Sequence, residues 1–378
     1  MTSGACVIDI GNRYRRHHCT GLDCRLTNLR NLLDYFGYKE SYSSVFGLSS
    51  SFDFGYRKSL NQEDRLQYPD FDFSPFFYSV TGHRFDCIEQ MAFNCSASMV
   101  GNYPDSPEAS LARMRHYLGN SIPVMVALSR MVISQHMRRP DGFPEYLQGI
   151  EFGGHWVILT AIDDVKKTVT IYDTDSPNPI EMPQEVFQFA RTCGDDHDNC
   201  LMKSRNRWVV FVPPARLPSR VHMVQTALAK TVYHMKIRAS AEESYRGLHG
   251  LQVFARELPL WPEMSELKGD RLKASTFILQ LNAEVLSSGL GRKLFASFLH
   301  QSADICKSDA LQEAANLCSD ASRCWRQLVH ILAPITNVST APSWNRWDKW
   351  ETEVLLERIL GLETKAVDKI EDFVDRGN

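Results

Sequence analysis

The sequence lacks a long hydrophobic run, a large excess of charge of one sign, and cysteines paired at metal-binding spacing. No stretch of about eighteen apolar residues occurs, so we expect no transmembrane helix and no membrane partner. The segment MTSGACVIDIGNRYRRHHC (1–19) has no apolar core of the kind that a secretory signal carries. The 42 basic and 45 acidic residues leave a formal charge of −3, so no global electrostatic footprint for nucleic acid is present.

The ten cysteines are too sparse in 378 residues for a disulfide scaffold, and no two of them form a CxxC pair. This usage is typical of a cytoplasmic protein with mostly free thiols, and we expect that location. The segment CGDDHDNC (193–200) holds two cysteines, a histidine and three aspartates, but it lacks a second pair of ligands. We therefore interpret it as a polar loop and expect neither a metal nor another cofactor.

The composition is that of an ordinary globular protein. Hydrophobic residues make up 43% of the chain, aromatic residues 11% and charged residues 23%. This excludes disorder and coiled coil as descriptions of the whole chain. A length of 378 residues predicts two domains, each able to bury a core.

The first part of the chain, to about residue 215, mixes helical and strand patterns. Apolar residues recur at helical spacing after Cys24, and Gly37 is a natural end for that helix. A second helix is expected over 108–118. The apolar runs that predict strands are 122–128, 156–162, 168–172 and 207–212. The linker DDVKK (163–167) between the middle two predicts an antiparallel hairpin.

From about residue 216 to the end, apolar residues recur at a spacing of three to four, which is typical of helices. The predicted fold is therefore α+β, with a mixed domain over 1–215 and an all-helical domain over 216–378. The aromatic stretches 45–56 and 68–80 lie in the first domain, and we expect loops and short strands there.

Three residues of the first domain are candidates for catalysis. Cys24 stands directly before a helical pattern, where the helix dipole and unpaired N–H groups favour a thiolate. His155 opens the first strand of the hairpin, and Asp173 follows the second strand. In a hairpin these two lie side by side, as a carboxylate must to hold an imidazole while its other nitrogen faces a thiol. Asp175 is the alternative carboxylate.

Each residue alone also has a structural interpretation. A lone cysteine before a helix is usually a small buried apolar residue, and a histidine that opens a strand is more often structural than catalytic. Their order is more informative. A cysteine before an early helix, followed by a histidine and a carboxylate on a later hairpin, is the order of papain-like cysteine enzymes.

Two segments resemble the butirosin biosynthesis protein H family. In CRLTNLRNLLDYFGYKESYSSVFGLSSSFDFGY (24–56), a cysteine precedes an asparagine–leucine–leucine helix, and an aromatic–glycine pair and an FGL-containing stretch follow. In GGHWVILTAIDDVKKTVTIYD (153–173), a glycine–histidine strand leads through an acidic turn to a strand that ends in aspartate. The helical C-terminal part is similar to the second domain of that family in outline.

The resemblance implies a papain-like cysteine-protease-type domain with an antiparallel sheet, followed by a helical domain. It also implies an acyltransferase of natural-product biosynthesis, as in the related closthioamide synthetase. The acyl donor would be a thioester on the phosphopantetheine arm of an acyl or peptidyl carrier protein, and the acceptor a small-molecule amine. Cys24 would be the nucleophile, His155 the general base and acid, and Asp173 the residue that orients His155.

The sequence departs from the family pattern near the cysteine. Family members commonly have histidine directly before the nucleophile, whereas Asp23 precedes Cys24 here and the His–Cys pair is His18–Cys19. Cys19 is therefore a rival nucleophile. The asparagine of the NLL run lies seven residues after Cys24, as in the family, and this spacing favours Cys24.

His18 stands six residues before Cys24, where papain-like enzymes often have a glutamine that donates to the oxyanion. We expect either that role, shared with the backbone N–H of Cys24, or an exposed loop histidine. The basic run RYRRHH (13–18) is either a docking site for an acidic carrier protein or a solvated turn.

We predict an acyltransferase that forms amides from carrier-bound thioesters. The aromatic stretches 45–56 and 68–80 would supply either core packing or the dry pocket that lets an amine compete with water. The alternatives are a papain-like hydrolase, acting on a peptide, amide or thioester, and a non-catalytic binding module on the same scaffold. The sequence leaves open whether the chain forms a homodimer.

Overall fold

The computed structural model describes residues 7–21, 23–58, 79–84, 86–102, 106–140, 154–192, 204, 206–237, 240–241, 244–264, 291–336 and 349–376. These residues form two compact units. The first unit comprises those within Met1–Glu40 and Ser96–Leu217. The second comprises those within Ser41–Asp64, Pro75–Cys95 and Pro218–Asn378.

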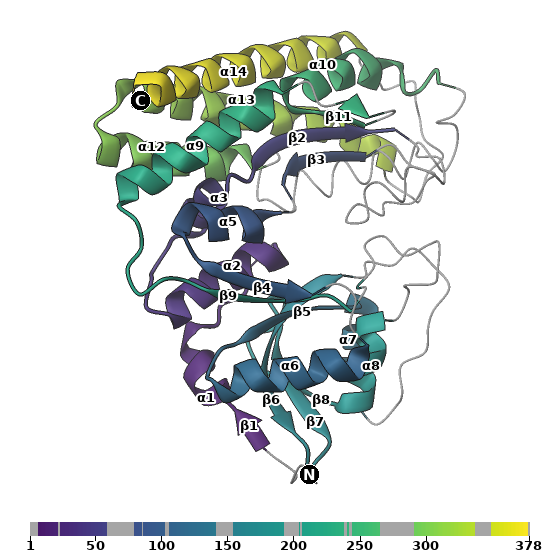
Figure 1. Ribbon diagram of the computed structural model, residues 1–378. Helices are drawn as coiled ribbons and strands as arrows, with labels where there is room; N and C mark the ends of the chain where they lie inside the picture. Colours follow the sequence, from purple (N-terminus) through teal and green to yellow (C-terminus); the bar gives the residue numbers. More distant parts are fainter. Residues whose placement is uncertain are drawn as a thin grey trace. The chain divides into compact units, whose positions relative to one another are not determined.

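An antiparallel sheet forms the centre of the first unit (Figure 1). Its order is β4-β9-β5-β6-β7-β8, and β1 pairs with β6. The strands are β1 (Val7–Asp9), β4 (Ser98–Asn102), β5 (Val124–Leu128), β6 (His155–Asp163), β7 (Thr168–Tyr172), β8 (Ile180–Pro183) and β9 (Trp208–Val212). β6 and β7 are the arms of the predicted hairpin, with Asp163 opposite Thr168 and Ile158 opposite Tyr172.

The helices of the first unit are α1 (Gly11–Tyr14), η1 (Arg15–His17), α2 (Cys24–Tyr35), α6 (Pro107–Gly119), α7 (Arg130–Arg138) and α8 (Gln184–Thr192). The last three pack on the sheet through one apolar core, which joins Met114, Ile133 and Phe187 to alternate residues of β5 and β6. Serines begin two of them: Ser106 Oγ accepts from the N–H of Ala109, and Ser129 Oγ from that of Val132.

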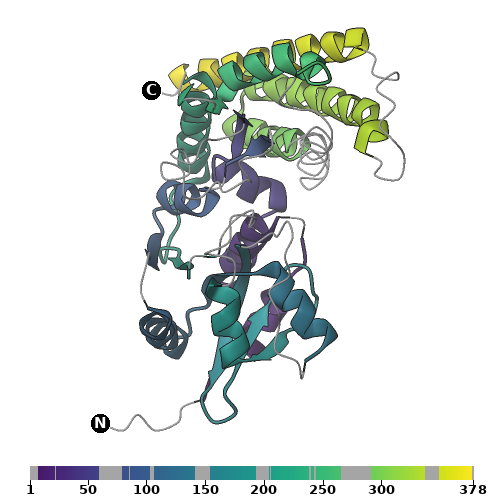
Figure 2. The same ribbon diagram turned by 90° about the vertical axis from the view of Figure 1, so that its right-hand side faces the viewer.

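The second unit combines a small sheet with helices. Its strand order is β10-β11-β2-β3, from β2 (Phe52–Arg57), β3 (Ser79–His83), β10 (Ser240–Ala241) and β11 (Ser244–Arg246). The helices are α3 (Tyr42–Leu48), α5 (Cys87–Cys95), α9 (Arg220–Lys236), α10 (Gly247–Glu257), η2 (Leu258–Leu260), α12 (Arg292–Cys306), α13 (Asp309–Thr336) and α14 (Lys349–Arg376). α13 and α14 lie side by side in both ribbon views (Figures 1 and 2).

A buried ion pair joins the elements of the second unit. Arg292 and Glu363 have no exposed side-chain surface and form two N–H···O contacts of 2.8 and 2.7 Å. Arg292 also donates to the carbonyls of Asp53 and Gly82, each at 2.9 Å. Trp325 Nε1 donates to Glu363 at 2.7 Å. Side chains from α12, α13 and α14 thus form one hydrogen-bonded network with the backbone of β2 and β3.

The mixed α/β class and the four predicted strand regions are confirmed, because β5, β6, β7 and β9 cover them. The expectation that 216–378 is all helical is wrong. β11 lies in that range and pairs with β2, where Tyr245 is opposite Tyr56. The second unit also takes in described residues of 41–64 and 75–95, which the prediction assigned to the first domain. The cause is that β2 and β3 supply the strands beside which β11 lies.

The stretch 45–56 is only partly as expected. Residues 42–48 form α3 rather than a loop, because Ser41 caps the helix by accepting from the N–H of Ser44 at 3.1 Å. Residues 52–57 form the predicted short strand. Most of the stretch 68–80 and all of CGDDHDNC (193–200) lie outside the described residues.

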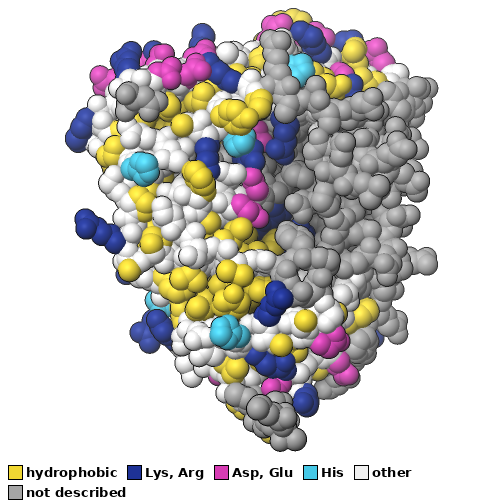
Figure 3. Space-filling view, viewed as in Figure 1, with side chains coloured by type: hydrophobic (Ala, Val, Ile, Leu, Met, Phe, Trp, Pro, Cys, Tyr) yellow, Lys and Arg dark blue, Asp and Glu magenta, His cyan; other side chains and the backbone are white. Residues whose placement is uncertain are grey.

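Charges of both signs are interspersed on the face seen in Figure 3. Ion pairs among the described residues include Lys236 Nζ with Asp368 at 2.8 Å and Arg115 with Asp164 at 2.6 Å. Among the described helices, none combines the length and the apolar character that a membrane span requires.

Candidate active site

Cys24 is the first residue of α2, and Asp23 caps that helix. Asp23 Oδ1 accepts from the N–H groups of Arg25 and Leu26, at 3.0 and 2.8 Å. The aspartate that stands where the family commonly has histidine is thus an N-cap. The cap does not use the N–H of Cys24, and this group stays at the positive end of the helix dipole, beside its own thiol.

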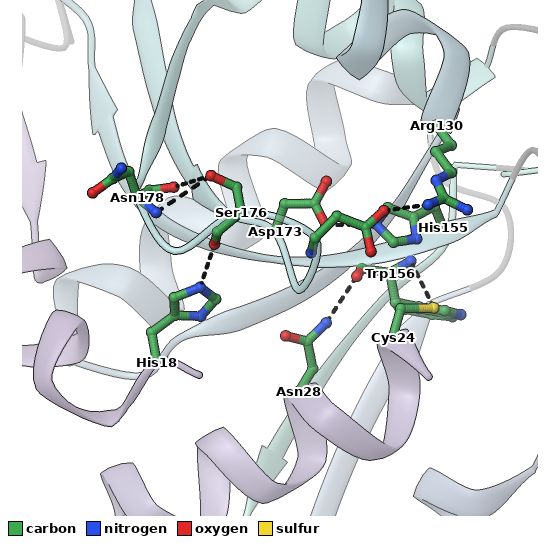
Figure 4. A network of polar contacts seen from close by, with 10 residues as sticks. His18, Cys24, Asn28, Arg130, His155, Trp156, Asp173, Ser176 and Asn178 are labelled. Carbon is green, nitrogen blue, oxygen red and sulfur yellow. Dashed lines mark hydrogen bonds and ion pairs between the residues drawn. The ribbon is translucent and has the colours of Figure 1, made fainter. Parts of the chain in front are cut away.

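The thiol of Cys24 lies against the beginning of β6 (Figure 4). The backbone N–H of Trp156 donates to Cys24 Sγ at 3.5 Å. The side chain of His155, the residue before, lies near enough to Cys24 for the thiol to raise the pKa of the imidazole. Cys24 is half-buried, so the thiol combines partial exposure with a backbone donor.

His155 is held from its other side by Asp173, as the hairpin predicts. His155 Nε2 lies 2.6 Å from Asp173 Oδ1, and only 9% and 4% of the two side chains are exposed. Asp173 directly follows β7, whose last residue pairs with Ile158. Since Nε2 is engaged by the carboxylate, Nδ1 is the nitrogen left for the thiol.

His155 and Asp173 each stabilise the charged form of the other. Burial acts to lower the pKa of His155, but the hydrogen bonds with Asp173 and Cys24 outweigh it and raise that pKa to about 10. Burial alone would raise the pKa of Asp173, yet the hydrogen bond and charge of His155 lower it below its ordinary value. The geometry therefore favours an imidazolium between a thiol and a carboxylate.

Asp175 has a different partner. Its Oδ2 lies 2.5 Å from the Arg130 guanidinium, and both side chains are substantially exposed. Its backbone N–H donates to Asp173 Oδ1 at 3.0 Å. Asp173 is therefore the residue that orients His155, and Asp175 helps to hold Asp173 in place.

His155, Asp173 and Asp175 offer ligand atoms within 4.8 Å of one another, close enough to surround a metal ion. Each of these side chains already has a partner in the protein, because His155 and Asp173 bind each other and Asp175 binds Arg130. A cation here would have to displace both contacts. We interpret the group as a hydrogen-bonded pair beside a surface ion pair.

His18 and Cys19 take other positions. His18 Nε2 donates to the carbonyl of Ser176 at 2.8 Å, and its ring lies 5.0 Å from that of Tyr172. This bond engages His18 Nε2 at Ser176, and the oxyanion role of His18 stays a prediction. Cys19 is exposed, and its carbonyl accepts from Asn31 at 3.0 Å. His155 contacts Cys24, which favours Cys24 over Cys19 as the nucleophile.

The basic run 13–18 forms α1, η1 and the residue after them. Arg13, Arg15 and Arg16 are exposed, and the guanidinium of Arg13 lies 4.7 Å from the ring centre of Tyr35. His17 Nδ1 is 2.7 Å from Asp34 Oδ2. Docking of a carrier protein on these arginines stays a prediction.

The comparison with known protein families matches a part of the chain that does not include these site residues. Residues 196–370 match the family model described as Domain of unknown function (DUF4872). No curated protein matches the sequence. Cys24, His155 and Asp173 all lie outside the matched residues, so the match gives no information about them.

Two side chains near the site were not predicted from the sequence. Asn28 Nδ2 donates to the carbonyl of Trp156 at 2.8 Å, and Arg130 holds Asp175. Asn28 stands four residues after Cys24 in the predicted helix, so helical periodicity places both on one face. No sequence signal pointed to Arg130, which is the first residue of α7.

Proposed function

We propose that the protein is a cysteine acyltransferase that forms an amide from a thioester. The observation that carries the proposal is that the thiol of Cys24 lies against the start of β6, beside His155, which is held by the buried carboxylate of Asp173. This arrangement supports nucleophilic chemistry at a thiol. The choice of a carrier-bound thioester and an amine rests on the resemblance of 24–56 and 153–173 to the butirosin biosynthesis protein H family.

In the first half-reaction the thiolate of Cys24 attacks the thioester carbonyl. The carbon–sulfur bond of the donor breaks, and the leaving thiolate takes the proton of the His155 imidazolium. The acyl group is then a thioester on Cys24. The bond broken and the bond made are alike, so this step is close to neutral in free energy.

In the second half-reaction an amine attacks the acyl-enzyme. Neutral His155 accepts the proton that the amine nitrogen loses, and the thiolate of Cys24 leaves as the amide forms. The imidazolium and thiolate are thereby restored. Formation of an amide from a thioester is downhill, so no nucleotide is consumed.

The negative oxygen of both tetrahedral intermediates needs a donor. The N–H of Cys24 is at the N-terminus of α2 and outside the cap of Asp23, so it is our candidate for that role. It is one of the two donors that the sequence predicted.

The test compares transfer with hydrolysis. Octanoyl-pantetheine or an octanoyl-loaded carrier protein is incubated with a panel of primary amines, and amide and free octanoate are quantified by mass spectrometry. We expect amide from wild-type protein and none above background from Cys24→Ala. The same dependence on Cys24 with octanoate as the product would make the protein a hydrolase. A wild type with no more turnover than Cys24→Ala for any donor would indicate a binding module.

A further inference from the structure

We propose that Asn28 is a positioning residue that fixes the thiol of Cys24 relative to His155. The part of this inference that concerns acyl transfer rests on the proposed function. The positioning role itself does not rest on the proposed function, because it concerns the distance and orientation between the side chains of Cys24 and His155.

Asn28 and Cys24 both form hydrogen bonds with the backbone of Trp156. Its carbonyl accepts from Asn28 Nδ2 at 2.8 Å, and its N–H donates to Cys24 Sγ at 3.5 Å (Figure 4). In a β-strand the N–H and C=O of one residue point to the same side. Cys24 and Asn28 are one helical turn apart, so one face of α2 meets one peptide edge of β6.

The sheet leaves that edge open for α2. The β6–β7 ladder reaches only to Ile158, opposite Tyr172, and the chain then departs toward Asp173. Trp156 lies beyond this last pair, so its N–H and C=O have no strand partner on the β7 side. Buried backbone groups need hydrogen bonds, and α2 supplies them through Cys24 and Asn28 in place of a strand.

The side chain of Asn28 is placed for this one contact. It has no exposed surface, and its buried Oδ1 has no hydrogen-bond partner among the described residues. An amide that leaves its oxygen unsatisfied is unfavourable for stability. Asn28 therefore contributes one hydrogen bond, from Nδ2 to the carbonyl of Trp156, the residue that directly follows His155.

Asn31 provides a matched control on the same helix. It is also fully buried, and its Nδ2 also donates to a carbonyl. That carbonyl belongs to Cys19 rather than to β6. Asn31→Ala therefore removes an equivalent buried amide without touching the contact between α2 and Trp156.

The test measures the reactivity of the Cys24 thiol directly. The rate of alkylation of Cys24 by iodoacetamide at pH 7 is followed by peptide mass spectrometry in wild type, Asn28→Ala, Asn28→Leu and Asn31→Ala. The charge of His155 is followed by NMR of labelled histidine over a pH titration. Asn28→Leu keeps the branching and the number of heavy atoms of the side chain while it removes the amide, so it serves where Asn28→Ala fails to fold.

We expect both Asn28 variants to slow alkylation by about 10-fold to 100-fold, because small misplacements of reacting groups have effects of that size. They should also lower the titration midpoint of His155, while Asn31→Ala stays within about twofold of wild type. Asn28 variants with wild-type alkylation and titration, or an equal effect of Asn31→Ala, would overturn the proposal.

The acyl-transfer assay separates this inference from the proposed function. If wild-type protein forms no amide while the Asn28 variants still slow alkylation, the proposed function fails and the positioning stands. If wild type forms amide and the Asn28 variants alkylate normally, the positioning fails and the proposed function stands.

Discussion

Asp173 Oδ1 accepts two hydrogen bonds, one from His155 Nε2 at 2.6 Å and one from the N–H of Asp175 at 3.0 Å. At the scale of residues, most of the site follows from where strands and helices begin and end. Cys24 begins α2, His155 begins β6, and Asp173 follows β7. These positions were predictable from apolar periodicity. The choice between Asp173 and Asp175 was not, because it depends on Arg130, which lies far away in the sequence.

The pair His155–Asp173 predicts how stability depends on pH. The pKa of His155 is raised from 6.5 to about 10, so its contribution is complete below pH 6.5 and is lost as the pH rises toward 10. The pKa of Asp173 is lowered from 3.8, so its contribution is complete above pH 3.8 and is lost in acid. The contribution of the pair is therefore largest between these two ordinary values.

We expect Asp173→Asn to reduce the free energy of unfolding by about 3 kcal/mol near pH 6, because it leaves a buried imidazolium without its partner. The deficit should shrink as the pH approaches 10. Guanidinium unfolding followed by circular dichroism at several pH values measures it. A deficit that is constant from pH 6 to pH 10 would contradict the assigned charges.

A second substitution separates the two aspartates. Asp173→Asn should slow acylation of Cys24 by on the order of 1,000-fold, because the imidazole loses the group that fixes its orientation. Asp175→Asn removes only an exposed ion pair with Arg130, so we expect a rate within about threefold of wild type. Single-turnover mass spectrometry gives both rates. A slower rate for Asp175→Asn than for Asp173→Asn would contradict the assignment of Asp173 as the orienting residue.

At the scale of elements, the strands with apolar runs were predictable and the short ones were not. β1 is three residues long, β4 (SMVGN) contains glycine, and β8 (IEMP) ends in proline. Their pairing with longer strands decides their conformation, which local propensity cannot show. The same holds for β11, whose partner β2 lies in a distant part of the sequence.

The buried pair Arg292–Glu363 is the clearest target among these contacts. Glu363→Ala should destabilise the second unit by about 3 to 5 kcal/mol, because Arg292 then stays buried without its counter-charge. The double variant Arg292→Met with Glu363→Leu should be less destabilised than the single one. Thermal unfolding of the three proteins provides the comparison, and a double variant that is the least stable would contradict this.

At the scale of the whole molecule, the candidate site and the family match fall in different parts of the chain. The first contains Cys24, His155 and Asp173, whereas the family match begins at residue 196 and falls mostly in the second. The predicted boundary near residue 215 missed the part of the second unit that comes early in the chain. Periodicity along a sequence cannot show that 41–58 and 79–95 pack with residues beyond 217.

The most direct test of the central claim is the intact mass of the protein after incubation with octanoyl-pantetheine, with no amine present. We predict that wild type and Cys19→Ala gain the mass of one octanoyl group and that Cys24→Ala gains none. An adduct that survives in Cys24→Ala, or that is lost only in Cys19→Ala, would contradict the assignment of Cys24 as the nucleophile.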